Sequence, residues 1–132
     1  MKLKTVIPAL FSLIMIIGCN TGYTGDDGVH LKQYLEPESM KALLESPHAG
    51  IMVIDVRPLK AYKKGHLPGA VSVPSPEFDT WFAGNRPDED LIVYCETGGR
   101  AQIVVKKLEE QGFTRVMNWG GYTRWKWEYE TD

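Results

Sequence analysis

The stretch of sequence that decides the fold is LIVYCETGGR, residues 91–100. Its first four residues are apolar and partly β-branched, which is typical of a strand buried on both faces. Cys95 ends this run and enters a Gly-rich turn, behind which an apolar repeat predicts a helix over residues 100–111. Backbone N–H groups in such a turn, together with the positive end of the helix dipole, favour negative charge. The stretch therefore predicts a cysteine held as a thiolate in an anion-binding loop.

Short apolar strands and helices alternate on both sides of this stretch. The alternation predicts an α/β fold with a parallel sheet covered by helices, and ligands of such sheets bind at the carboxyl ends of the strands, where Cys95 lies. We expect strands at residues 51–55, 71–73, 91–94 and 115–118, helices at 37–44, 58–64, 77–82 and 100–111, and an aromatic helix at the C-terminal end.

The first thirty residues differ from the rest. Lys2 and Lys4 precede an apolar run over residues 6–17 that is short for a membrane span and typical of a signal peptide. The segment ending in Cys19 resembles a bacterial lipobox, which predicts a lipoprotein signal peptide over residues 1–18 and lipidation of Cys19. An ordinary secretory signal is the alternative. Residues 19–30, rich in glycine and polar residues, are predicted to form a flexible tether before a domain at 31–132.

The net charge, the histidine spacing and the number of cysteines limit the functions that this chain is expected to have. Removal of the signal peptide leaves 13 basic and 17 acidic residues, a balance that argues against nucleic-acid binding. His30, His48 and His66 have no metal-ligand spacing with one another or with Cys95. If Cys19 is lipidated, Cys95 has no partner in the chain. An unpaired thiol in an exported protein indicates reactivity, whereas the structural alternative is an inert, buried cysteine.

Four segments stand in a telling order along the chain: IMVIDVR at 51–57, GHLPGA at 65–70, the Cys-x-x-Gly-x-Arg loop at 95–100 and GGYTRW at 120–125. Together they resemble the rhodanese-like sulfurtransferases. The resemblance implies a rhodanese-like three-layer α/β fold with a central, mostly parallel sheet of about five strands flanked by helices, here in a single-domain lipoprotein form.

The same resemblance implies a sulfur-transfer reaction. Cys95 is expected to attack a sulfane sulfur of thiosulfate, a persulfide or a polysulfide, and to hold it as a persulfide until cyanide or a thiol accepts it. No metal or organic cofactor is expected, and the enzyme is expected to work as a monomer. The loop residues expected to hold the anionic sulfur are Glu96, Thr97, Gly98, Gly99 and Arg100.

Some of these residues admit two interpretations. Arg100 either holds the anion of a donor or ties the loop to Asp55. Asp55 and Arg57 are expected to form a buried ion pair, and His66 to be a hydrogen-bonded loop residue rather than a general base. Glu96 departs from the family pattern: its carboxylate either repels thiosulfate or points into solvent.

Other functions stay open. A cysteine phosphatase also has a Cys-to-Arg loop, but with five intervening residues instead of the four found here. A thiol-redox or persulfide-relay module would use the same thiolate. A non-catalytic binding domain would use its aromatic C-terminal end, although packing is the commoner role of aromatics at this spacing. The aromatic residues of that end are Trp119, Tyr122, Trp125, Trp127 and Tyr129.

We expect the protein in the bacterial cell envelope, anchored by lipid to a membrane on its extracytoplasmic side. A protein thiol of the envelope is a further candidate acceptor of the sulfur.

Overall fold

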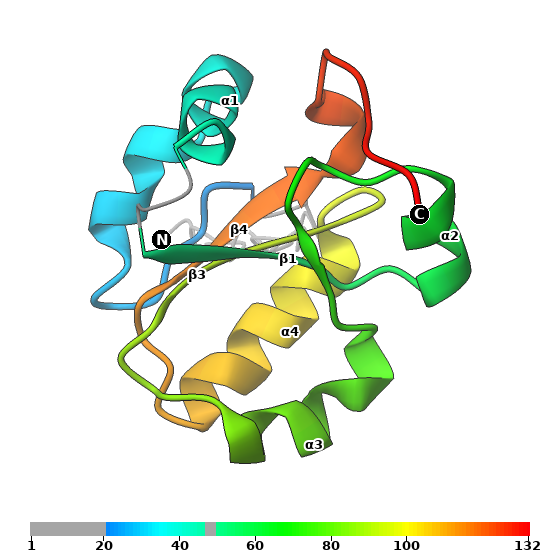
Figure 1. Ribbon diagram of the computed structural model, residues 1–132. Helices are drawn as coiled ribbons and strands as arrows, with labels where there is room; N and C mark the ends of the chain where they lie inside the picture. Colours follow the sequence, from blue (N-terminus) through cyan, green and yellow to red (C-terminus); the bar gives the residue numbers. More distant parts are fainter. Residues whose placement is uncertain (1–20, 47–49) are drawn as a thin grey trace, which may run out of the picture.

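A parallel sheet forms the centre of the computed structural model, which describes residues 21–46 and 50–132. Within these residues the sheet has four strands in the order β2-β1-β3-β4, so the expectation of about five strands is wrong by one. All neighbouring strands run parallel, as the alternation of strands and helices predicts (Figure 1). The strands are β1 (Ile51–Asp55), β2 (Val71–Ser72), β3 (Asp90–Cys95) and β4 (Val116–Gly121).

Helices cover both faces of this sheet and give the predicted three layers. In Figure 1, α3 and α4 lie on one face, and α1 with the preceding 3₁₀ helix η1 lies on the other. The α-helices are α1 (Pro37–Leu44), α2 (Leu59–Lys64), α3 (Phe78–Trp81) and α4 (Gly99–Glu110), and the 3₁₀ helices are η1 (Val29–Tyr34), η2 (Ser75–Glu77), η3 (Phe82–Gly84) and η4 (Tyr122–Arg124). None of the helices in the described part of the chain is long and apolar enough to cross a membrane.

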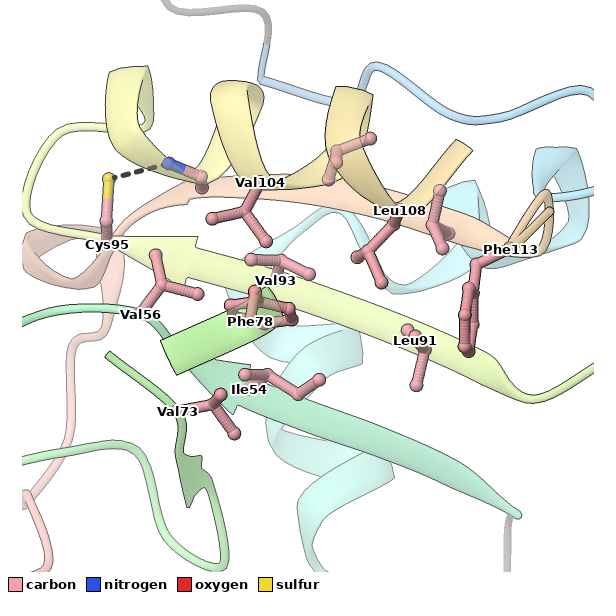
Figure 2. Packing of buried hydrophobic residues seen from close by; sticks show 13 residues of the cluster. Ile54, Val56, Val73, Phe78, Leu91, Val93, Cys95, Val104, Leu108 and Phe113 are labelled. Atoms are coloured by element: carbon pink, nitrogen blue, oxygen red, sulfur yellow. Dashed lines mark hydrogen bonds between the residues drawn. The ribbon is translucent and has the colours of Figure 1, made fainter. Parts of the chain in front are cut away.

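The central strand β3 is buried on both sides, which explains its unbroken apolar sequence. Successive side chains of a strand point to opposite faces. Leu91, Val93 and Cys95 therefore join the core beneath α4 (Figure 2), and Ile92 and Tyr94 join the core beneath α1 and η1. This alternation turns Cys95 toward the face that carries α4.

The prediction of a flexible tether is wrong for residues 21–30. The backbone of this segment pairs with β4: Gly22 N donates to Asn118 O at 2.7 Å, and Gly25 N donates to Val116 O at 3.0 Å. The glycines that suggested flexibility instead permit close approach, because a Cβ on Gly25 would lie 2.4 Å from Thr114 O, and a Cβ on Gly28 would lie 2.4 Å from Val116 O. Residues 1–20, with the predicted signal peptide and Cys19, lie outside the described residues.

The predicted aromatic helix at the C-terminal end is also wrong. After η4 no residue is helical, and Glu130 forms an antiparallel bridge with His66 through two backbone hydrogen bonds of 3.0 and 2.9 Å. Trp119 and Trp125 are buried in the core beneath α1. Their spacing therefore reflects packing, the commoner of the two interpretations of these aromatic residues.

We predict that Gly28→Ala destabilises the domain by about 1–3 kcal/mol, because the new methyl group would overlap the backbone of Val116. Urea unfolding followed by circular dichroism measures the change. Gly84→Ala is the matched control, since a Cβ there meets no atom within 4 Å, and its expected effect is within about 0.5 kcal/mol. Equal stability of the two variants would contradict the packing of residues 21–30 against β4.

Candidate active site

Cys95 lies at the carboxyl end of β3, where its sulfur faces the first turn of α4 (Figure 2). The sulfur accepts hydrogen bonds from the backbone N–H groups of Gly98 at 3.0 Å and Ala101 at 3.4 Å. The residue is 1% exposed and forms no disulfide. Two N–H donors at a helix N-terminus stabilise negative charge on the Cys95 thiolate, and they favour an anionic outer sulfur bonded to it in a persulfide.

A left-handed glycine gives the loop its shape. Gly98, the residue before α4, has φ of 99° and ψ of −17°, a conformation that side-chain-bearing residues rarely adopt. Gly98 is buried, whereas Glu96, Thr97, Gly99 and Arg100 are exposed. The predicted loop residues therefore lie together around Cys95, and the contacts to its sulfur come from the backbone of Gly98 and Ala101.

Asn118 supports this loop from β4, and the sequence analysis did not identify it. Its side-chain nitrogen donates to Gly98 O and to Gln102 Oε1, both at 3.0 Å. Its side-chain oxygen accepts a hydrogen bond from Gly120 N at 2.9 Å. Asn118 is completely buried. The signal in the sequence was a single amide in an otherwise apolar strand, because a buried polar side chain needs partners.

The end of β4 approaches the loop so closely that it requires glycine. A Cβ on Gly121 would lie 2.5 Å from Glu96 O and 3.1 Å from Thr97 Cα. The register between β3 and β4 shifts by one residue, since Val93 pairs with Asn118 but Tyr94 pairs with Gly120. Gly120, directly after this bulge, has φ of 104°, so a left-handed backbone at Gly120 and close approach at Gly121 explain why the GGYTRW segment begins with two glycines.

Asp55 and Arg57 form the predicted ion pair, at 2.7 Å and fully buried. Arg57 also donates to Gly65 O at 2.6 Å and lies 4.0 Å from the ring centre of Tyr122. Burial opposes its charge, but the hydrogen bonds and charge of Asp55 outweigh burial and hold the pKa of Arg57 above its usual value. Arg57 thus joins the end of β1 to the GHLPGA segment and the C-terminal segment.

Glu96 and Arg100 are both exposed, unlike the buried pair. The side chain of Glu96 is 61% exposed, and its carboxylate lies 3.8 Å from Arg57 Nη1. The suggestion that Arg100 ties the loop to Asp55 is wrong, because Asp55 pairs with Arg57 instead. The side chain of Arg100 makes no hydrogen bond or ion pair with any described residue, so its guanidinium is free to meet a ligand.

His66 is packed into the GHLPGA segment, as its interpretation as a loop residue predicts. Its Nδ1 donates to Tyr62 O at 2.8 Å, and its ring stacks on that of Tyr62 with centres 3.7 Å apart. The adjacent Leu67 N donates to the hydroxyl of Tyr94. The pKa of this hydroxyl is raised well above its usual value, first by burial and then by the charge of Asp55. These contacts fix the segment against β3 and leave general-base catalysis by His66 without support.

No group of three or more histidine, cysteine, aspartate or glutamate side chains within residues 21–46 and 50–132 could hold a metal ion. His48 lies outside these residues. The chemistry that the site offers on its own is that of a nucleophilic sulfur: Cys95 is positioned by the backbone, and a free cation, Arg100, follows in the same loop.

Comparison with known proteins agrees with this geometry. A family model described as the rhodanese-like domain matches residues 36–128. The chain is 27% identical over 81 residues to the putative sulfur carrier protein YrkF of Bacillus subtilis, covering 61% of this chain and 43% of that protein. It is 30% identical over 99 residues to the thiosulfate sulfurtransferase GlpE of Pseudomonas fluorescens, covering 74% and 88%. The chain therefore spans less than half the length of YrkF but most of GlpE.

Solved structures give the same result. The crystal structure of a rhodanese-like domain protein from Staphylococcus aureus superposes with a TM-score of 0.64 at 25% identity, covering 73% of this chain and 94% of that one. The four-stranded parallel sheet, the Cys95 loop at its carboxyl edge and these matches lead to one conclusion: the chain belongs to the rhodanese-like domain family.

Proposed function

We propose that this protein is a sulfurtransferase in which Cys95 carries the sulfur. The observation that supports the proposal most strongly is the pair of N–H donors, from Gly98 and Ala101, directed at the Cys95 sulfur. Relatives named as sulfurtransferases support sulfur transfer in general. The donor, the acceptor and the persulfide intermediate are parts of the proposal.

The reaction has two displacements at sulfur. In the first, the Cys95 thiolate attacks the sulfane sulfur of the donor. A bond forms between the two sulfur atoms, the bond to the donor remnant breaks, and the remnant leaves with the electron pair. In the second, a thiolate or cyanide attacks the outer sulfur of the persulfide and releases the Cys95 thiolate. The loop serves both steps because the negative charge stays close to its backbone donors: it is on the Cys95 sulfur before loading, and on the outer sulfur of the persulfide, one bond away, after loading.

The alternatives rest on weaker observations. A dithiol redox mechanism needs a second cysteine, and Cys95 is the only cysteine in the described part of the chain. The four-residue Cys-to-Arg spacing does not fit a phosphatase loop. A pure binding role does not explain the hydrogen bonds to the Cys95 sulfur.

We further propose that lipidation of Cys19 holds the domain at the bacterial envelope. There, small persulfides or a protein thiol would supply and accept the sulfur.

The first prediction from the proposed function concerns Cys95. After incubation with thiosulfate, a small persulfide or an inorganic polysulfide, intact-protein mass spectrometry is expected to find a mass gain of one sulfur on the wild-type domain. Cyanide is expected to remove it. Cys95→Ser is expected to gain no sulfur, because serine offers no thiolate. A folded wild-type domain that gains no sulfur from any of the three donors would refute the proposed function.

The second prediction concerns Glu96 and thiosulfate. Because its carboxylate would repel a dianion but is largely exposed and close to Arg57, we expect Glu96→Gln to raise the rate with thiosulfate only about twofold to fivefold. The rate with an uncharged organic trisulfide should not change. The control is Glu110→Gln, an exposed carboxylate at the far end of α4. Equal rates of Glu96→Gln and wild type with thiosulfate would show that Glu96 has no part in donor selection.

The third prediction concerns the contact between β4 and the loop. Gly121→Ala is expected to displace Glu96 and Thr97, and with them the N–H groups that hold the sulfur. We expect the rate of persulfide formation at Cys95 to fall at least about tenfold, less than the roughly 100- to 1,000-fold loss caused by removing one oxyanion donor, because the N–H groups are displaced and not removed. Gly28→Ala is the control, because it strains the chain away from the loop. Persulfide formation at the wild-type rate in a folded Gly121→Ala domain would contradict this role of β4.

A further inference from the structure

A hollow of about 420 Å³ lies beside the Cys95 loop, between the start of α2, the helix η2 and the start of α4. Two of its wall residues, Val56 and Arg100, connect directly to neighbours of Cys95. Val56, on one wall, donates its N–H to Tyr94 O at 3.1 Å, immediately before Cys95. Arg100, on another wall, directly precedes Ala101, whose N–H contacts the Cys95 sulfur.

The hollow has the size and surface of a site for a small organic molecule. Pockets for such molecules measure about 300–1,000 Å³, far more than cyanide or thiosulfate needs. Its walls include Pro58, Pro74 and Pro76, whose rings fix the backbone, and Leu59, which is 47% exposed. An exposed leucine among prolines provides a preformed apolar surface for the carbon atoms of a ligand.

Two opposite charges also line the hollow, and neither has a partner. Glu77 and Arg100 both form part of the wall, yet neither makes a side-chain hydrogen bond or ion pair with any described residue. They do not pair with each other. A ligand that presents an ammonium group to one and a carboxylate to the other would satisfy both at once, with charge-assisted hydrogen bonds.

We propose that this hollow binds the organic half of the sulfur substrate, and that the substrate is an α-amino acid thiol in its persulfide form. The ammonium group meets Glu77, the carboxylate meets Arg100 and the carbon chain lies against Leu59. The Cys95 thiolate then attacks the outer sulfur, the S–S bond of the substrate breaks, and the amino acid leaves as a thiolate with the electron pair. This inference rests on the proposed function and assigns Glu77 and Leu59 as specificity residues.

Three donors that differ by one group test the proposal: the persulfides of cysteine, of cysteamine, which lacks the carboxylate, and of 3-mercaptopropionate, which lacks the ammonium group. Rates of sulfur loading onto Cys95 are measured as a function of donor concentration. For Glu77→Gln we expect KM to rise about tenfold with the cysteine and cysteamine donors, and kcat to stay constant. With 3-mercaptopropionate persulfide the variant should equal wild type.

Two further variants complete the experiment. Leu59→Ser, at a half-exposed position, should raise KM for all three donors by a similar factor, and Glu110→Gln should change none. An equal effect of Glu77→Gln on all three donors, or no effect on any, would overturn the proposal. Loading of wild-type Cys95 tests the sulfurtransferase function separately. If the wild-type domain loads equally well from all three donors, whatever the charge of the donor, the proposed function stands and the proposed specificity site is refuted.

Discussion

The structure depends on one constraint: the sulfur of Cys95 must face the N-terminal turn of α4 with backbone donors directed at it. The alternation of β3 sends Cys95 to the face that α4 covers, and the left-handed Gly98 turns the chain back within three residues. The N–H groups of Gly98 and Ala101 then reach the sulfur. A buried sulfur with two donors is stabilised when it carries negative charge, which is the state that sulfur transfer requires.

Other parts of the fold hold this arrangement in place. Asn118 fixes the carbonyl of Gly98, and Gly121 allows β4 to pass beneath Glu96. Arg57 joins Asp55 to Gly65 and lies over the ring of Tyr122. The hydrogen bonds to the sulfur therefore come from backbone alone, whereas the Asn118 side chain, from β4, holds the backbone of the loop in place. The two arginines have different roles: Arg57 pairs with Asp55 and Gly65 inside the protein, and Arg100 is available to a substrate.

The sequence predicted what depends on local pattern and left out what depends on long-range contact. The apolar run of β3, the helix behind it and the Cys95 loop follow from residues that are adjacent in the chain. Asn118 acts on Gly98 across twenty residues, and no local pattern reveals such a pair. The glycines of residues 21–30 were misread because a linker and a tight backbone contact have the same composition. The aromatic spacing near Trp125 indicated a helix, but burial in the core accounts for it.

The most direct test of the central claim is to observe the two donors while sulfur arrives. Proton–nitrogen NMR spectra of the labelled domain are recorded before and after Cys95 is loaded with one sulfur. We expect the amide signals of Gly98 and Ala101 to move most, because their N–H groups contact the sulfur whose charge changes, while the amide of Gly112 at the other end of α4 stays in place. A loaded domain in which the signals of Gly98 and Ala101 do not move would contradict a backbone cradle for the persulfide.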